Sequence, residues 1–211
     1  MGLSGGADSL TLLWMLTARL SRIPINYELY AVFIDPGFEE SFGEPLQAFC
    51  REQGFNLRVE YTDYGIVSHS PANRENPCFL CSRLRRRRLF EIAEELNCAK
   101  LALGHNKDDI IETFLMNIFY AGEVSTMLPS QGFFQDKFTV IRPLAFTDEA
   151  LIRRFARDQN FPEFINPCPT SKISKRREIK NLLKQLFRTN RKIKGNIFRA
   201  MSHVKMDYML K

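Results

Sequence analysis

The sequence predicts an α/β protein with a doubly wound parallel sheet and a basic helical C-terminal tail. Two observations predict this fold class. Short apolar runs alternate with longer stretches of helical periodicity along most of the 211 residues, which is typical of parallel strands joined by crossover helices. In addition, two glycine turns, at residues 4–9 and 104–109, each stand directly before a helical pattern. In such sheets, turns of this kind gather at the carboxyl ends of the strands and bind ligands there.

The expected elements follow in order along the chain. Strands are predicted at residues 29–34, 56–62, 100–103 and 138–141, where short runs are apolar or alternate. Helices are predicted at residues 41–53, 81–97, 107–120, 148–159, 174–189 and 195–206, where apolar residues recur every three or four positions. Residues 63–77 are rich in turn formers and are predicted to form a mobile loop.

The start of the chain does not fit this pattern. Only Met1, Gly2 and Leu3 precede the first glycine turn, which is too few for the central strand expected there. A sheet without that strand would leave backbone donors and acceptors unpaired. We therefore expect the first strand to be missing and the N-terminus to be incomplete.

Composition predicts a globular protein of the cytoplasm. Hydrophobic residues make up 45% and charged residues 26% of the chain, which is ordinary for a packed domain. No apolar run is long enough for a membrane helix, and no signal peptide pattern is present. The cysteines are odd in number, which in a reducing compartment favours ligands or reactive thiols over disulfides. They are Cys50, Cys78, Cys81, Cys98 and Cys168, of which Cys50 and Cys98 are predicted to pack in the core.

Charge is distributed unevenly. Residues 172–211 hold 13 Lys and Arg against Glu178 and Asp207, whereas the preceding part is slightly acidic. A basic tail on an acidic body favours a polyanionic partner such as nucleic acid. A solvated helical face is the alternative.

The first glycine turn, Ser-Gly-Gly-Ala-Asp-Ser at residues 4–9, is predicted to cradle phosphate. Gly5 and Gly6 allow a tight turn that a ligand can approach closely, and the amides at the start of the next helix attract anions. Ser4 and Ser9 add hydroxyl donors, and Asp8 could cap the helix or hold a metal ion. The loop lacks the Gly-Lys-Ser/Thr ending of a Walker A motif, so it indicates another nucleotide-binding class. A simple turn before a helix is the alternative.

The second glycine turn begins at Gly104 and is expected to face the first. Asp108 and Asp109 follow it and could bind Mg²⁺ on a pyrophosphate. Helix capping alone is the alternative.

Three cysteines form a candidate metal site. Cys78 and Cys81 make a Cys-x-x-Cys pair near a predicted helix start, and Cys168 lies between two prolines. Three thiolates could hold a [4Fe–4S] cluster and leave one iron without a protein ligand, since four cysteines are the usual set. Zinc, a redox pair and chance remain open. His69 and His203 are interpreted as surface residues, and Trp14 as core.

A basic group follows the cysteine pair. It consists of Arg83 and Arg85 to Arg88, which could contact RNA phosphates. A solvated face balanced by Glu91, Glu94 and Glu95 is the alternative.

Together these segments resemble the tRNA 2-thiocytidine synthetase family of PP-loop ATP pyrophosphatases. The resemblance extends to about residue 170 and rests on the order and separation of its motifs. They are residues 4–9, 63–67, 78–86, 102–113, 117–120, 140–146 and 167–168. The chain departs from the family at Ser171, where a further cysteine is frequent, and in its basic C-terminal region.

The resemblance implies ATP-dependent thiolation of tRNA at a cytidine of the position 32 type, with a PP-loop domain at residues 1–170 and a tail at 171–211. It implies that the phosphates of ATP are held by Ser4, Gly5, Gly6, Asp8, Ser9 and Gly104, and adenine by the strand end around Phe33 and Ile34. Mg²⁺ would lie near Asp8 and Asp109, and the sulfur would come through a [4Fe–4S] cluster on Cys78, Cys81 and Cys168. These five residues are the expected catalytic set, with Arg83, Arg85 and Arg86 contacting RNA.

The resemblance also implies a cysteine desulfurase as sulfur donor, a homodimer and no membrane association. Two other functions remain open. One is a tRNA lysidine synthetase, which joins lysine to an adenylated cytidine and needs no cluster. The other is a non-catalytic iron–sulfur or RNA-binding paralogue.

Overall fold

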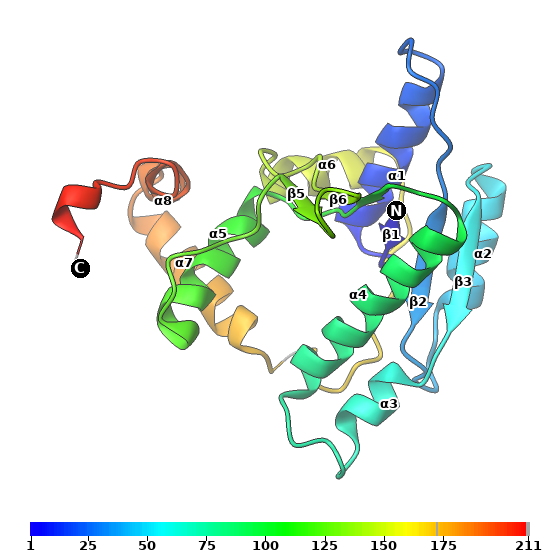
Figure 1. Cartoon of the computed structure of the whole chain (residues 1–211), viewed down its shortest axis with the longest axis horizontal. Helices are drawn as coiled ribbons and strands as arrows, with labels where there is room; N and C mark the ends of the chain where they lie inside the picture. Colours follow the sequence, from blue (N-terminus) through cyan, green and yellow to red (C-terminus); the bar gives the residue numbers. More distant parts are fainter. Residues whose placement is uncertain (172, 210–211) are drawn as a thin grey trace.

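A computed structural model describes residues 1–171 and 173–209, in which two three-stranded half-sheets lie beside each other (Figure 1). The first half-sheet is fully parallel, with the order β1-β2-β3. Its strands are β1 (Gly2–Leu3), β2 (Ala31–Asp35) and β3 (Leu57–Tyr61). The second has the order β4-β6-β5, with β5 antiparallel. Its strands are β4 (Lys100–Ala102), β5 (Ser130–Phe133) and β6 (Phe138–Ile141).

Helices cover both faces of the first half-sheet, which confirms the predicted doubly wound α/β class. The long helices are α1 (Ala7–Leu20), α2 (Gly43–Glu52), α4 (Pro77–Glu95), α5 (Lys107–Met116), α6 (Glu149–Asp158), α7 (Lys175–Thr189) and α8 (Lys192–Ala200). Short helices are α3 (Tyr64–His69), a π-helix at Asn117–Ala121 and a 3₁₀-helix at Met206–Tyr208. None of the helices in the described ranges is long and apolar enough to cross a membrane.

The predicted absence of the first strand is wrong. Gly2 and Leu3 pair in parallel with Val32 and Phe33, so β1 is present with two residues. Leu3 is 2% exposed and lies in the core. Gly2 lies against the side chains of Leu103 and Leu89, so β1 reaches the second half-sheet through side-chain packing.

Three other expectations are corrected. The segment predicted as a mobile loop contains α3, because Tyr64 packs its ring with Val32 and Ile34 in a small core cluster. Helix α4 begins at Pro77 rather than residue 81, because Asn76 caps it and proline suits the first helical turn. The antiparallel strand β5 was not predicted.

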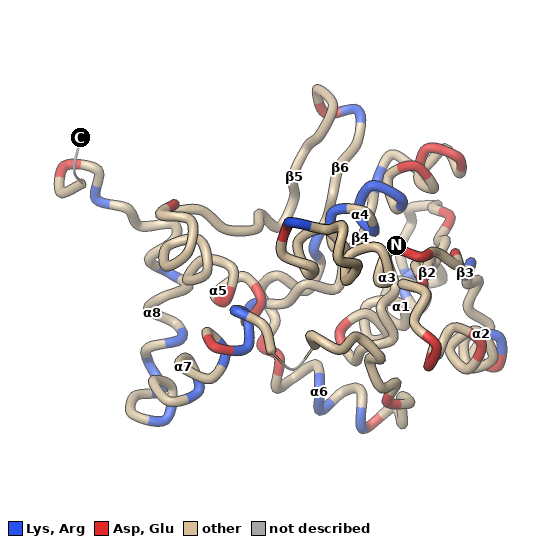
Figure 2. Tube along the Cα trace, turned by 90° about the horizontal axis from the view of Figure 1, so that it is seen from below, with Lys and Arg blue, Asp and Glu red and all other residues tan. Residues whose placement is uncertain are grey.

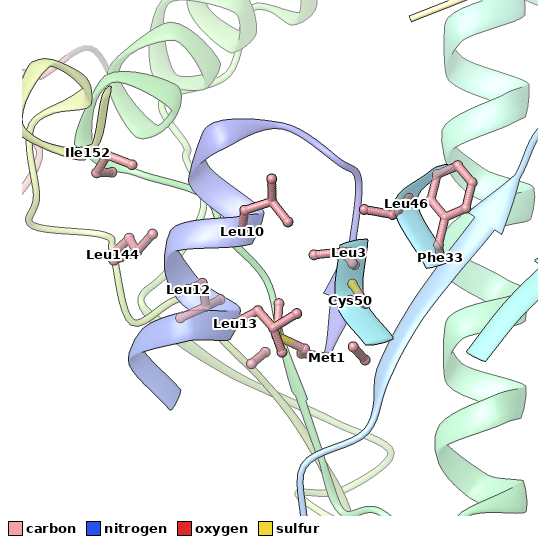
Figure 3. Packing of buried hydrophobic residues seen from close by; sticks show 12 residues of the cluster. Met1, Leu3, Leu10, Leu12, Leu13, Phe33, Leu46, Cys50, Leu144 and Ile152 are labelled. Atoms are coloured by element: carbon pink, nitrogen blue, oxygen red, sulfur yellow. The ribbon is translucent and has the colours of Figure 1, made fainter. Parts of the chain in front are cut away.

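The main core fills the space between the first half-sheet and helices α1, α2 and α6 (Figure 3). Leu10, Leu13 and Phe33 are each at most 2% exposed. Cys50 is fully buried there, as predicted. Cys98, in contrast, is only partly buried, because it follows the end of α4 where the chain turns toward β4.

The basic tail packs on the body instead of extending from it. Ile179 and Leu183 of α7 are buried with Ile111 of α5 in a separate apolar cluster. Figures 1 and 2 show α7 and α8 beside α5, and Figure 2 shows Lys and Arg along α7 and α8. The docking of α7 therefore covers one side of α5, whose first turn contributes to the candidate site.

Candidate nucleotide and cysteine sites

The first glycine turn has the conformation of an anion cradle. Gly5 has φ +75°, a conformation that side chains disfavour, and a Cβ there would stand 2.7 Å from the Phe42 ring. The Ser9 hydroxyl accepts a hydrogen bond from the Ser4 amide at 3.1 Å and donates to the Gly6 carbonyl at 3.0 Å. These bonds fix the turn. In the described chain no side chain caps α1 at Gly6, so the helix start can bind an anion.

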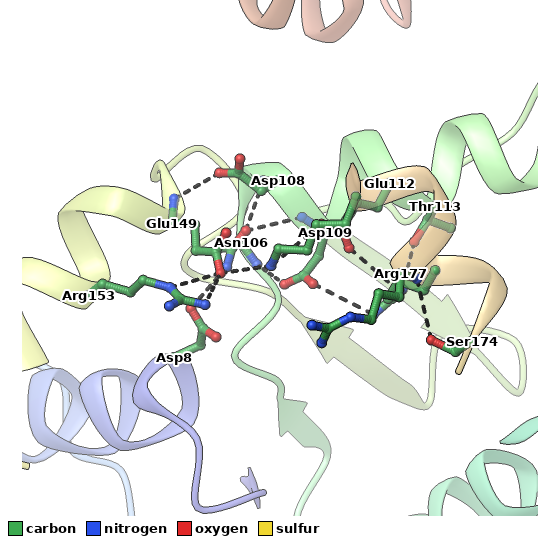
Figure 4. A network of polar contacts seen from close by, with 12 residues as sticks. Asp8, Asn106, Asp108, Asp109, Glu112, Thr113, Glu149, Arg153, Ser174 and Arg177 are labelled. Atoms are coloured by element: carbon green, nitrogen blue, oxygen red, sulfur yellow. Dashed lines mark hydrogen bonds and ion pairs between the residues drawn. The ribbon is translucent and has the colours of Figure 1, made fainter. Parts of the chain in front are cut away.

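The second glycine turn lies against the first, as predicted. A Cβ on Gly104 would be 3.1 Å from backbone atoms of Asp8 and Ser9, so only glycine allows this approach without a shift. Asn106 joins the two turns (Figure 4), because its side-chain Nδ2 donates a hydrogen bond to Asp8 Oδ1 at 2.9 Å. The Asn106 backbone N–H donates to Asp109 Oδ2 at 3.0 Å. The buried Asn106 therefore hydrogen-bonds to both carboxylates that are predicted to bind Mg²⁺, those of Asp8 and Asp109.

A cavity of about 290 Å³ opens beside these turns. Its polar lining comes from Ser4, Asp8, Ser9, Gly104, His105, Asp109 and Arg85, and its apolar lining includes Val32 and Ile34. Phe33 is not among the lining residues; it is 2% exposed and packs on Phe42 at 5.0 Å between ring centroids. The Phe33 side chain faces the core, because successive residues of a strand face opposite sides of the sheet. The predicted adenine role of the strand-end backbone around Phe33 and Ile34 stays a prediction.

Arg85 lies in this cavity, apart from the other arginines of α4. Its Nε is buried and has no hydrogen-bond partner within the described residues. A buried N–H donor without a partner is costly. A phosphate oxygen in the cavity would satisfy it.

Burial dominates the electrostatics of the cavity. Burial raises the pKa of Asp8, and the hydrogen bond from Asn106 partly offsets this rise. Burial also lowers the pKa of His105 to about 4, so its ring is neutral at neutral pH. Arg142 Nε lies 3.3 Å from His105 Nδ1 and donates to it. His105 lines the cavity and was not predicted as a site residue, although it lies within the second glycine turn.

The two adjacent aspartates have different roles. Asp109 lines the cavity, whereas Asp108 Oδ2 accepts from the Glu149 amide at 2.8 Å and from Lys194 Nζ at 2.7 Å. Asp108 therefore anchors α6 and α8. Arg176 of α7 approaches Asp109 Oδ1 at 3.6 Å.

Glu112 lies deeper along α5. It is 3% exposed, and burial raises its pKa to about 7 despite Lys180 and Arg176 at 3.7 and 3.8 Å.

The three predicted cysteine ligands gather at one place. Cys78 and Cys81 lie in the first two turns of α4, and Cys168 comes from the loop before α7. The Thr170 hydroxyl lies 3.5 Å from Cys78 Sγ and 3.4 Å from Cys168 Sγ. Burial raises the pKa of the Cys81 thiol, with smaller contributions from Cys168 and Cys78. All three thiols are free of disulfides.

The spacing of these donors does not suit a single ion. Among residues 1–171 and 173–209, no three His, Cys, Asp or Glu side chains stand close enough around one point to hold one metal ion. A [4Fe–4S] cluster uses a different iron for each thiolate, so its ligands stand further apart.

The interpretation of His69 as an unpartnered surface residue is wrong. His69 Nε2 lies 3.1 Å from Thr170 Oγ1 and 4.0 Å from Cys168 Sγ. His203, in contrast, is exposed, as predicted.

Helix α4 connects the cysteines to the cavity. Arg85 is one helical turn beyond Cys81, which is about 6 Å along the axis. Arg83 and Arg86 remain exposed, and Arg83 pairs with Glu75 at 3.0 Å. Arg88 instead pairs with Glu60, Glu91 and Glu95 and is structural.

The fold and the glycine turns define an α/β protein of the PP-loop class. The sequence pattern described as the PP-loop domain matches residues 1–186. The chain is 38% identical to a tRNA-cytidine(32) 2-sulfurtransferase of Geobacter sulfurreducens over 100% of this chain and 83% of that protein. A protein of the same name from Geotalea daltonii is 39% identical, over 100% and 84%. The chain belongs to the tRNA-cytidine(32) 2-sulfurtransferase family.

A solved structure is also similar. It is the U34-tRNA thiolase NcsA from Methanococcus maripaludis with its [4Fe–4S] cluster. The TM-score is 0.79 and the identity 28%, over 97% of this chain and 72% of that chain.

Proposed function

We propose that this protein is an ATP-dependent tRNA thiolase that replaces the 2-oxygen of a cytidine, at position 32, with sulfur. The observation that carries the proposal is the placement of a PP-loop cavity and a cysteine triad along one helix, α4. The cavity suits activation of an oxygen by ATP, and the triad suits a sulfur-handling cofactor. The names of the relatives supply tRNA, cytidine and position 32.

The residues of the cavity fit ATP and Mg²⁺. The uncapped start of α1 and the hydroxyls of Ser4 and Ser9 would bind the phosphates, and Arg85 Nε would gain a phosphate oxygen as partner. Asp8 and Asp109 offer the carboxylate oxygens that Mg²⁺ prefers.

The 2-oxygen of cytosine attacks the α-phosphorus and pyrophosphate leaves. A sulfide then attacks carbon 2 with its electron pair and AMP departs, because adenylation converts a poor leaving group into a good one.

The cysteine triad fits an iron–sulfur cluster by its chemistry, since it offers three free thiols from two segments. Cys78 and Cys168 meet at the Thr170 hydroxyl. Burial raises the pKa of the Cys81 thiol, and Cys81 is close enough to Cys168 and Cys78 for their charges to raise it further. Cys78, Cys81 and Cys168 would hold the cluster, and it would supply the sulfur.

The remaining parts of the proposal concern partners. We infer that residues 1–170 form the catalytic domain and that residues 171–211 and the exposed Arg83 and Arg86 contact tRNA. The exposed Lys184, Arg188, Arg191 and Lys192 of the tail support this. A cysteine desulfurase as sulfur donor, a homodimer and a cytoplasmic location complete the proposal, and rest on the resemblance alone.

The test is purification without oxygen, followed by visible absorption and analysis of iron and acid-labile sulfide. We expect a brown protein with about four of each per chain. Cys168→Ala should lose thiolation of tRNA and keep ATP binding, whereas the matched variant Cys98→Ala should keep both. A colourless protein would overturn the cluster mechanism and favour lysidine synthesis or a non-catalytic RNA-binding role. Thiolation of tRNA by Cys168→Ala would show that the cluster role of this cysteine is wrong.

A further inference from the structure

A second cavity, of about 800 Å³, lies between α4 and the turn that joins β5 to β6. It is larger than the nucleotide cavity and shares no lining residue with it. Its lining combines aromatic and basic side chains, which are those of Phe90, Phe134, Phe138, Arg83, Arg86, Arg87 and Lys137. Aromatic rings beside basic side chains are typical of sites that bind single-stranded nucleic acid.

The aromatic part of the cavity is a preformed surface. Phe90 of α4 packs edge-on against Phe138 of β6, with ring centroids 5.1 Å apart, and against Phe134, at 6.3 Å. Phe134 is nevertheless 66% exposed, so much of its ring remains open to solvent. A ring that is anchored on its neighbours and still exposed offers a face on which a planar ligand can stack.

The backbone of the turn displays this ring. Phe134, Gln135 and Asp136 all have positive φ, at 54°, 57° and 64°, a conformation that bulky residues disfavour. A Cβ on Gly132 would stand 1.8 Å from Asp136 Oδ1, so the turn folds back onto β5 where only glycine fits. The hairpin projects from the body of the protein (Figure 2). Strained backbone of this kind is frequent where a structure positions a side chain for binding.

The charges around the ring suit a polyanion with a polar base. The four cations of the lining outnumber its two carboxylates, Glu91 and Glu94. Arg86 and Lys137 are exposed and form no ion pair within residues 1–171 and 173–209, whereas the other two arginines of the lining pair with glutamates. Asn97 also lines the cavity, and its exposed amide can both donate to and accept from the edge of a base.

We propose that this cavity binds one unpaired nucleotide of the tRNA, with its base stacked on Phe134 and the flanking phosphates on Arg86 and Lys137. This inference rests on the proposed function, which makes an RNA the substrate. Proteins recognise unpaired RNA bases by stacking them on aromatic rings, and position 32 opens the unpaired loop of the anticodon arm. Arg85 and Phe90 are five residues apart on α4, about 8 Å along the axis, which a few unpaired nucleotides can span. The cavity would thus hold a neighbour of the cytidine that enters the nucleotide site.

The experiment measures, by fluorescence anisotropy, how the cluster-loaded full chain binds an anticodon stem–loop RNA with cytidine at position 32. Phe134→Ala should weaken binding by about 5- to 100-fold, the effect of losing one stacked base. Phe134→Trp should keep the wild-type affinity, because its ring can still stack, whereas Phe134→Leu should not. Phe119→Ala, the matched control at an exposed phenylalanine outside the cavity, should bind as the wild type does.

A second measurement tests the stacked base itself. The loop nucleotides are replaced one at a time by an abasic residue. At one position the replacement should weaken binding to the wild type and leave binding to Phe134→Ala unchanged, because one stacking contact can be lost only once. Iron content and binding of an ATP analogue check that Phe134→Ala is folded.

The outcomes separate the two proposals. Equal RNA affinity of the wild type and Phe134→Ala, or a wild type that loses affinity at no abasic position, would overturn the base-binding cavity and leave the thiolase proposal standing. Dissociation of a dimer by Phe134→Ala with unchanged RNA affinity, seen by sedimentation, would also overturn it and assign the cavity to a second copy of the chain. A protein without iron and without thiolation, but with the expected abasic pattern, would overturn the thiolase proposal and support the base-binding cavity.

Discussion

Asn106 is the residue whose replacement tests the architecture of the cavity most directly. It is 2% exposed and its side chain makes two kinds of contact. Its oxygen accepts from the amides of Asp108 and Asp109 at 2.8 and 3.1 Å, which caps α5. Its nitrogen donates to Asp8 Oδ1 at 2.9 Å, which ties α5 to the first glycine turn.

The expected cost of Asn106→Ala follows from these contacts. Loss of an N-cap costs about 1 kcal/mol, and loss of a hydrogen bond to a charged group costs about 1.5–3 kcal/mol. The free energy of unfolding should therefore fall by about 2.5–4 kcal/mol. Asn106→Ser retains a capping oxygen but is too short to reach Asp8, so it should lose only about 1.5–3 kcal/mol.

The assay is urea unfolding at pH 8, where linear extrapolation gives the free energy of unfolding, combined with a double-mutant cycle. In an Asp8→Ala background, Asn106→Ala should cost only about 1 kcal/mol, because the cap is then its one remaining loss. An equal cost of Asn106→Ala in both backgrounds would refute the contact between the two turns.

Two further predictions concern the cavity and the helix behind it. Arg85→Ala should weaken binding of a non-hydrolysable ATP analogue by about 10- to 100-fold, the contribution of one charge-assisted hydrogen bond. The control Arg87→Ala, at an exposed position of the same helix, should bind the analogue normally. Titration calorimetry that finds the same affinity for both variants would place Arg85 outside the site. Glu112 has a folded-state pKa of about 7, above its ordinary value of 4.5, so its contribution to stability is present below pH 4.5 and is lost as the pH rises through 7. Glu112→Gln should remove that decline. The free energy of unfolding, measured from about pH 5.5 to 8.5, would contradict the prediction if the variant kept the wild-type dependence on pH.

Sequence patterns predicted the elements with strong periodicity and missed those with little. Strand β6 and helix α7 were predicted within one residue, because their apolar positions repeat clearly. Strand β1 has two residues, too few for any period, and its pairing depends on a partner about 30 positions away. Helix α3 did carry a signal, since Tyr64 and Val67 are spaced as on one helical face, but neighbouring turn residues masked it.

The parts of the site that depend on glycine turns could be predicted, because such turns leave a recognisable local pattern in the sequence. The facing of the two turns follows from glycines after the carboxyl ends of β1 and β4, which meet where Gly2 packs on Leu103. The separation of Arg85 from Arg83 and Arg86 could not be predicted, because the sequence alone does not show which face of α4 meets the cavity. His69 could not be found, because its partner lies 101 residues away and no local pattern marks such a contact.

The division of the strands into two half-sheets has a consequence for how the chain assembles. The ladder hydrogen bonds of the described residues close either within residues 2–61 or within residues 100–141. Pairing within short stretches of chain forms faster than pairing between distant ones, so the strand ladder of each half can form before the two halves dock. The bond between Asn106 and Asp8 spans 98 residues and closes only when the halves dock. The nucleotide cavity is therefore expected to form late in folding. Binding of ATP during refolding would then report the docking of the two half-sheets.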